Sequence, residues 1–420
     1  MHVTIDNMFA FLILLLILVT FMGYIIPSAY LSFTTVKEHQ LEEVAQAIMD
    51  KVLLSPGIPE DWGDILRVND SSQLSAFGLQ KAGGAPYELD VNKVLRIVSM
   101  NSSSKIMLPE TIRIDPYTIA RLLGLGHEYG FSMKITPALN ISFRVLEYYS
   151  FENGDLKDPV PMKVEARVIT PEGRPAIGAN ATGLFIFMTI MKIKQGQGQP
   201  EEISYINSTY ATSTVDLDGK AIFSFETFLK SLDKMLRERG ERGEIIKLEH
   251  ACSAAVVYAD YYGIRTSRSE PLGNISGILK GTTVGKYLIV EYPIDGFPKG
   301  NEGARQLENQ TGLADPPYYV YTSTLQNDTN GQSGMVINKG AKKYRVYELS
   351  NAVDDDVSLI ILPVKYLGNY TAILFFRNPY DLTCQVGLAS GNIKTSVLRR
   401  MVKIGSFHYM FEVRVWRWGE

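Results

Sequence analysis

The residues best suited to chemistry in this 420-residue chain are asparagines in Asn-x-Ser/Thr sequons, the acceptor sequence for N-linked glycans. Nine of the 18 asparagines begin a sequon, against roughly two or three expected by chance from the serine and threonine content. They are Asn69, Asn101, Asn140, Asn180, Asn207, Asn274, Asn309, Asn327 and Asn369. This excess predicts an exposed, glycosylated polypeptide. The alternative is that polar turns enrich asparagine together with serine and threonine.

Enzymatic chemistry is not indicated by the remaining residues. The five histidines are scattered, and no His-Glu-x-x-His zinc motif, Gly-x-Ser-x-Gly nucleophile elbow or phosphate-binding loop is present. The acidic run 354–356 lacks the spacing of a calcium loop and is interpreted as a solvated turn. We therefore expect no enzymatic activity, no catalytic residue, no cofactor and no bound metal. A net charge of -3 gives no indication of nucleic-acid binding.

The two cysteines of the chain, Cys252 and Cys384, allow one possible disulfide. Such a bridge would tie the middle of the chain to its last region. The alternative is a pair of buried thiols. Sequence spacing does not distinguish the two, because a bridge requires Cα atoms within about 7 Å of each other.

The segment that would hold these residues at a cell surface is the run 8–26, in which 17 of 19 residues are apolar. A helix of this length spans about 28 Å, close to the roughly 30 Å hydrocarbon core of a bilayer. We predict an uncleaved transmembrane anchor, a single N-terminal helix in the membrane. A buried core helix and a cleaved signal peptide are the alternatives. The sequons then place about 390 residues outside the cell.

An amphipathic stalk helix is predicted to follow the anchor, so that 1–54 form one long helical region. Apolar residues recur at steps of three and four along it, which is the spacing of one helical face. They are Leu41, Val44, Ile48 and Val52. Pro27 is a candidate kink between anchor and stalk, and Pro56 with Gly57 ends the helix.

Four motifs follow the helix in a fixed order. They are LLSPGIPEDWG at 53–63, FGLQ at 77–80, YELDVNKVLRI at 87–97 and LLGLGHEYGFSMKIT at 122–136. With the apolar N-terminus, they make residues 1–150 resemble archaeal surface proteins that have a type IV pilin-like N-terminal helix. The chain departs from that pattern because no Lys/Arg-Gly processing site precedes the apolar run, and Asp6 is the only acidic candidate near its start.

Three domains are predicted beyond the helix. Residues 55–150 indicate a small α+β domain. Residues 160–267 alternate as strands around an Asp-Gly hairpin turn and resemble immunoglobulin-like or transthyretin-like β-sandwich modules, with a helical insertion at about 228–239. Seven short apolar runs in 285–420 predict a second, C-terminal β-sandwich. The expected fold class is a long N-terminal α-helix (transmembrane plus stalk), then an α+β domain and all-β immunoglobulin-like sandwiches.

The resemblance implies a structural glycoprotein, a subunit of an archaeal extracellular pilus-like filament or cell-surface assembly. Its N-terminal helices would pack in the core, with glycosylated β domains outside. Its expected partners are further copies of itself, other pilin-like or surface-layer proteins, the membrane, and N-linked glycans. The alternative is a monomeric, single-pass membrane-anchored adhesin or cell-envelope binding protein.

Overall fold

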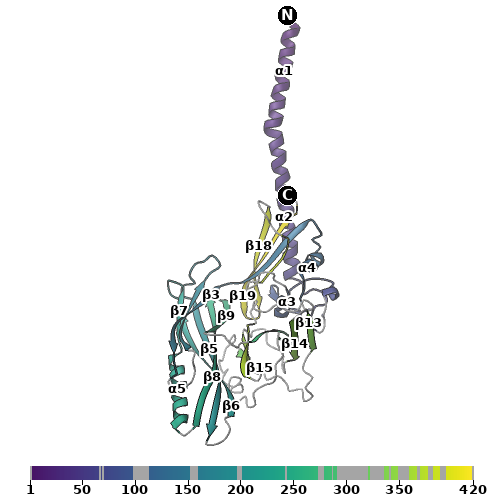
Figure 1. Cartoon of the computed structure of the whole chain (residues 1–420). Helices are drawn as coiled ribbons and strands as arrows, with labels where there is room; N and C mark the ends of the chain where they lie inside the picture. The colour runs from purple at the N-terminus through teal and green to yellow at the C-terminus, as the bar shows by residue number, and fades with distance from the viewer. Residues whose placement is uncertain are drawn as a thin grey trace.

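The architecture comes from a computed structural model, in which most of the N-terminal two thirds of the chain and its last strands are described. The described residues are 2–65, 68, 71–97, 113–151, 159–195, 201–241, 244–272, 279–285, 287–290, 320–321, 335–339, 342–348, 359–366, 369–376, 382–387 and 394–418. They fold mostly as β-strands, and a helical N-terminus projects from one end (Figure 1).

The N-terminal helical region consists of three successive segments. They are α1 (His2–Thr20), a π-helical turn (Phe21–Ile25) and α2 (Ile26–Leu53). Pro27 has no N–H to donate to the carbonyl of Gly23, so a wider turn falls where the regular α-helical hydrogen bond cannot form. Among the side chains of α2 that the structure describes, the first one buried in the head is that of Leu41.

The predicted fold class is therefore wrong at the N-terminus. The helical region is not one long α-helix, because the π-helical turn separates α1 from α2. Among the residues that the structure describes, no helix is both long and apolar enough to cross a membrane. The transmembrane-plus-stalk helix expected from the apolar run is replaced by this segmented helix.

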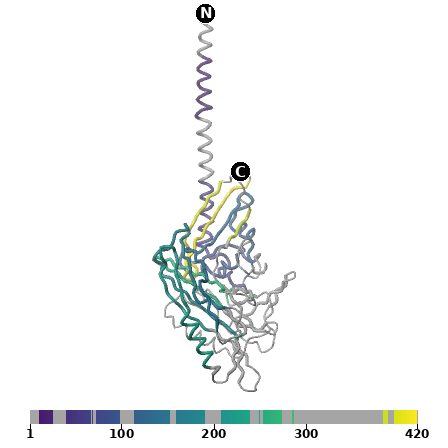
Figure 2. Tube along the Cα trace, turned by 60° about the vertical axis from the view of Figure 1, so that its left-hand side comes forward, coloured from purple at the N-terminus to yellow at the C-terminus, as the bar shows by residue number. Residues whose placement is uncertain are grey.

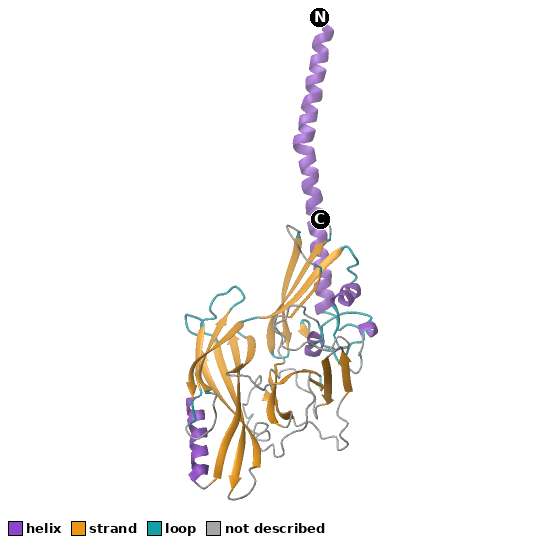
Figure 3. Ribbon diagram, in the orientation of Figure 1, coloured by secondary structure: helices purple, strands orange, loops and turns teal. Residues whose placement is uncertain are grey.

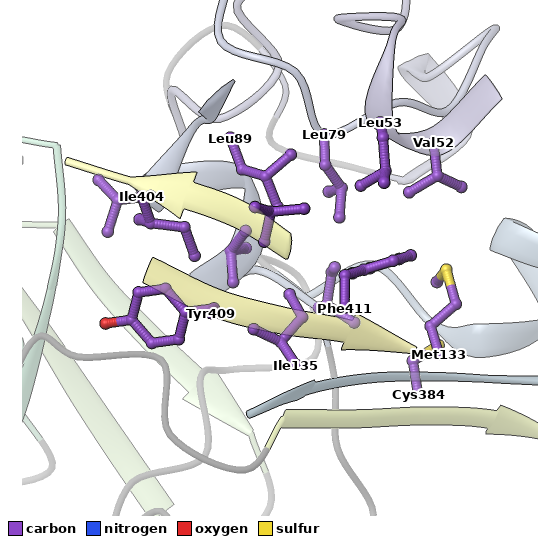
Figure 4. Close-up of a cluster of buried hydrophobic side chains, with 14 of the residues drawn as sticks. Val52, Leu53, Leu79, Leu89, Met133, Ile135, Cys384, Ile404, Tyr409 and Phe411 are labelled. Atoms are coloured by element: carbon purple, nitrogen blue, oxygen red, sulfur yellow. The ribbon is translucent and has the colours of Figure 1, made fainter. Parts of the chain in front are cut away.

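A five-stranded sheet, which we call the first sheet, packs against α2. Its order is β1 (Glu88–Leu89), β18 (Thr395–Ile404), β19 (Phe407–Arg417), β2 (Tyr129–Pro137) and β17 (Leu382–Val386). The side chains between helix and sheet form the head core, shown in Figure 4, where Val52 and Leu53 of α2 lie over Phe411 of β19 and Ile135 of β2. Burial of this face fixes the register, because a shift of one residue would expose every core side chain.

Short helices complete the head around this core. They are the 3₁₀-helix Ser71–Gln73, α3 (Val91–Leu95) and α4 (Pro116–Leu123). Both ends of α4 follow local sequence rules. The Asp115 side chain accepts from the Thr118 N–H, Pro116 occupies the first turn, and Gly124 ends the helix at φ 80°.

A second unit is a β-sandwich made of two sheets. One sheet has the order β3 (Asn140–Tyr149), β4 (Val160–Ile169) and β7 (Lys220–Ser224). The other has the order β6 (Glu201–Thr214), β5 (Asn180–Gln195), β8 (Glu244–Tyr261) and β9 (Ile264–Leu272). Helix α5 (Glu226–Glu241) lies along the sandwich (Figure 3), at the place predicted for the helical insertion.

Strands β5 and β8 are buried on both faces. Phe185 and Phe187 point into the sandwich core, whereas Leu184 and Ile186, which alternate with them along β5, belong to the head core. The ring of Tyr258 in β8 stacks on Phe407 of β19, with 6.0 Å between the ring centroids. This two-sided burial explains why β5 is continuously apolar in sequence rather than alternating.

The C-terminal sandwich predicted for 285–420 does not contain all the strands described in that range. Seven strands make one sheet, in the order β12 (Val320–Tyr321), β15 (Leu359–Tyr366), β16 (Asn369–Phe376), β10 (Leu279–Val284), β11 (Tyr287–Val290), β14 (Lys342–Glu348) and β13 (Met335–Lys339). Strands β17, β18 and β19 instead pair with β2 and β1. Segments more than 200 residues apart in sequence thus share the first sheet.

Candidate assembly site

The most unusual surface of the protein is the apolar segment Ala10–Tyr24, which we call the shaft. Every residue in it is exposed. Twelve of its side chains are large and apolar, and they are 49% to 76% exposed. They are Phe11, Leu12, Ile13, Leu14, Leu15, Leu16, Ile17, Leu18, Val19, Phe21, Met22 and Tyr24. Figures 1 and 2, seen 60° apart, both show the shaft extending away from the head.

The shaft is apolar around its whole circumference, because its apolar residues are consecutive rather than spaced at a helical period. Besides the phenol of Tyr24 at its end, the shaft has the hydroxyl of Thr20, which donates to the Leu16 carbonyl at 2.7 Å and so offers little to water. Fully covering a leucine or isoleucine is worth about 1.5–3 kcal/mol, so covering the shaft is worth on the order of 10 kcal/mol or more. An exposed apolar surface of this extent is characteristic of an interaction site.

The shaft is attached to a rigid base in α2. Leu41, Ile48 and Val52 are buried in the head core, and Val44 is half-buried, which confirms the apolar face predicted for this helix. Two polar contacts add to this packing. Lys51 Nζ donates to the Leu122 carbonyl at 2.8 Å, and Arg417 Nη2 donates to Gln40 Oε1 at 3.1 Å.

Beside α2, the loop that follows it is held by a buried pair of cations on α3 and the residue after it. Lys93 Nζ donates to the carbonyls of Pro56 and Gln80 at 2.9 and 2.8 Å. Arg96 Nη2 donates to the Val68 carbonyl at 2.6 Å, and its Nη1 donates to the Trp62 carbonyl. These cations satisfy loop carbonyls that would otherwise be buried without donors.

The indole of Trp62 lies close to both cations. Its ring centroid is 6.0 Å from Lys93 Nζ and 5.9 Å from Arg96 Cζ, and its Nε1 donates to the Gly78 carbonyl at 2.9 Å. Burial lowers the pKa of Arg96 to about 10, and it also lowers the pKa of Lys93. Trp62 is a packing residue, because its side chain is fully buried.

The junction between head and sandwich contains His408. Its Nδ1 accepts from the Arg265 N–H at 3.2 Å, and its carbonyl accepts from the Ala138 N–H at 3.0 Å. Burial lowers the pKa of His408, and the nearby cation Lys403 lowers it further. The bond to Arg265 is available only while Nδ1 carries no proton.

We expect the protein to lose stability as the pH falls from 7.5 to 5. The folded pKa of His408 lies below its unfolded value, so its contribution is present above pH 6.5 and is lost as the pH falls through the folded pKa. Urea unfolding at both pH values measures this loss of stability. In His408→Gln the difference between the two pH values should shrink, and an unchanged difference would contradict the assignment.

The structure describes the side chains of three of the nine sequon asparagines. Asn140 and Asn180 are exposed at the starts of β3 and β5. Asn207 lies within β6, is half-buried, and its Oδ1 accepts from the Ser208 N–H at 2.8 Å. Asn369 begins β16, and its side chain is not among those described. Asn69, Asn101, Asn274, Asn309 and Asn327 lie outside the described residues.

Glycan occupancy is expected to follow this exposure. An acceptor asparagine must present its amide nitrogen to an incoming sugar, which Asn140 and Asn180 can do without rearrangement. We expect glycopeptide mass spectrometry of the native protein to find higher occupancy at Asn140 and Asn180 than at Asn207. Equal or higher occupancy at Asn207 would contradict the expectation.

The disulfide considered for Cys252 and Cys384 is not formed. Cys384 is a free thiol, buried on β17 in the head core. Burial raises its pKa, so the thiol stays protonated and unreactive. Cys252 lies on β8, in the four-stranded sheet of the sandwich, and its side chain is not among those described. Cys384 is therefore a buried thiol, which was the alternative to the disulfide.

Other polar clusters have structural roles. Asp216 Oδ1 accepts from the N–H groups of Asp218 and Lys220 at 2.9 and 2.8 Å, which stabilises the hairpin turn. The acidic run 354–356 lies outside the described residues. Within the described part of the chain, no group of three or more His, Cys, Asp or Glu side chains could hold a metal ion.

Comparison of the chain with models of known protein families, with curated proteins and with solved structures finds no match. The function is therefore argued from the exposed surfaces of this chain alone.

Proposed function

We propose that this protein is a structural subunit of an extracellular pilus-like filament or cell-surface assembly, in which the shafts of neighbouring copies pack together. The observation that carries the proposal is the shaft itself, with twelve large apolar side chains exposed on a helix that projects from a folded head. A cover for this helix must supply apolar surface on all sides. The shafts of further copies supply this apolar surface, and each of them is covered in turn by its neighbours.

The rest of the molecule supports a structural role. The shaft continues through the π-helical turn into a helix that is anchored in the head core, so its placement relative to the head is defined by packing. The exposed sequons Asn140 and Asn180 lie on the sandwich, not on the shaft or on α2. Glycans there would leave the helices uncovered.

The proposal is tested by removing detergent from the purified full-length chain and examining the product by electron microscopy and sedimentation. We expect regular oligomers or filaments with the heads outside. The same sample is mixed with liposomes and separated by flotation. A chain that stays monomeric and floats with the vesicles would overturn the proposal and favour the adhesin alternative.

A further inference from the structure

The outer face of the first sheet, turned away from α2, is basic. Its side chains alternate with those of the head core, so Arg399 and Lys403 of β18, Arg414 of β19 and Lys134 of β2 share this face. All four are exposed. We call this surface the basic face. Val397 and Met401, each 42% exposed, add apolar area to it.

One carboxylate lies within the basic face and organises it. Glu412 Oε2 accepts from Arg399 Nε, and Glu412 Oε1 accepts from Arg414 Nε, both at 2.6 Å. Burial alone would raise the pKa of Glu412, but the two arginine hydrogen bonds outweigh it and lower the pKa. These four cations outnumber Glu412 and Glu172, the second of which is a carboxylate that interacts with Arg399, so the face stays net positive. The arginines are thereby held in place rather than free to move.

The exposed side of α2 is acidic. Glu43 and the half-buried Asp50 lie opposite its buried residues, and the exposed Glu42 lies on one flank of the helix. Its one described cation, Lys51, is bonded to the Leu122 carbonyl. His39 Nε2 lies 3.5 Å from Glu43 Oε1, and both side chains remain largely exposed. We call this surface the acidic strip.

The two surfaces lie on opposite sides of a two-layer lobe, since α2 covers one face of the first sheet and the basic face is the other. They cannot meet within one molecule. Their signs are complementary, and complementary surfaces at different places on one chain make a head-to-tail contact. Such a contact generates a ring or an open filament, whereas two identical patches facing each other would stop at a dimer.

We propose that the acidic strip of one copy docks on the basic face of the next. This inference rests on the proposed function and specifies its partner surface: the shafts supply apolar cover, and the lobes set the order and spacing of the copies. Glu42 and Glu43 pair with the cations around Glu412, and Val397 with Met401 provides the apolar part of the contact. The strip lies on α2, which follows the shaft after the π-helical turn, so one pair of neighbours is placed to make both contacts.

The test is a charge swap in the full-length chain, with assembly followed by sedimentation after detergent removal. Glu42→Lys with Glu43→Lys should raise the concentration needed for assembly about tenfold or more, and Lys134→Glu with Lys403→Glu should do the same. All four changes together should restore assembly to within about threefold of the unaltered chain. Lys234→Glu, an exposed change on α5, is the matched control and should have no effect.

Thermal melting of each variant separates unfolding from loss of contact. Assembly of the unaltered chain should also weaken as salt rises from 50 to 500 mM, a readout that needs no substitution. Unchanged assembly in both double variants overturns this inference. So does a quadruple variant that melts at the normal temperature but does not recover assembly. Leu14→Ser with Leu18→Ser distinguishes the two levels. If it abolishes assembly while the charge variants do not, the proposed function stands and only the docking contact fails.

Discussion

Replacing Leu14 and Leu18 with serine is expected to abolish assembly at concentrations where the unaltered chain assembles fully. These side chains are 61% and 49% exposed in the isolated chain. Replacing them therefore removes few contacts within one molecule, but many of the contacts that a neighbouring copy would make. Each lost leucine contact costs about 1.5–3 kcal/mol, and every 1.4 kcal/mol is a factor of ten in affinity. We expect the critical concentration to rise at least about 100-fold, as measured by sedimentation.

The matched control keeps the apolar surface. Leu14→Met with Leu18→Met should assemble within about threefold of the unaltered chain, because methionine buries a similar area. The melting temperature of the head should stay the same in both variants, since the shaft contacts no part of the head core. Assembly by the serine variant at the ordinary concentration would remove the basis of the proposed function.

Arg96→Met is expected to cause the largest loss of head stability among single substitutions of charged residues. The guanidinium is fully buried, and its removal leaves the carbonyls of Trp62 and Val68 without their donor. We expect the free energy of unfolding to fall by about 3–4 kcal/mol, measured by urea denaturation of the full chain in detergent. The indole of Trp62 should also become more accessible to a fluorescence quencher.

An exposed arginine provides the comparison for Arg96. Arg144→Met changes the same side chain at an exposed position of β3 and should alter stability by no more than about 0.5 kcal/mol. If both variants lose the same stability, the buried hydrogen bonds are not the cause. Loss of 1 kcal/mol or less in Arg96→Met would show that the loop carbonyls find other donors.

Local structure was predictable where short-range rules decide it. Asp115-Pro116 and Gly124 bound α4 because a side-chain cap, a first-turn proline and a left-handed glycine act within a few residues. The alternating pattern at 407–417 likewise predicts β19. The buried face of α2 follows from helical spacing. These elements needed no information from distant parts of the chain.

Strand partners were not predictable. Alternation of apolar and polar residues indicates a strand but does not indicate which strand pairs with it. The pattern of β19 fits a C-terminal sandwich as well as it fits pairing with β2, which lies about 270 residues earlier. Strands β10, β17 and β18 were also missed. In β18 the arginines Arg399 and Arg400 interrupt the apolar pattern. Arg399 belongs to the basic face, so one of the two residues that obscured the strand in sequence also takes part in the docking proposal.

The candidate site was predictable in part. The consecutive apolar residues of the shaft are evident in sequence, but the π-helical turn that separates α1 from α2 is not. Sequence also could not place the basic face, because its members come from β2, β18 and β19 and meet only through pairing at long range. The exposure that separates Asn180 from Asn207 likewise depends on tertiary packing.

Disulfide crosslinking within the shaft tests the central claim most directly. A Leu14→Cys variant, made with Cys252→Ser and keeping the buried Cys384, is assembled and then oxidised. Tyr262→Cys, at a loop residue that is 90% exposed on the sandwich, is the control in the same background. Packed shafts predict that most Leu14→Cys chains become covalent dimers in assembled material and that few do so in detergent. Assembled material in which Leu14→Cys crosslinks no more than Tyr262→Cys would contradict the account.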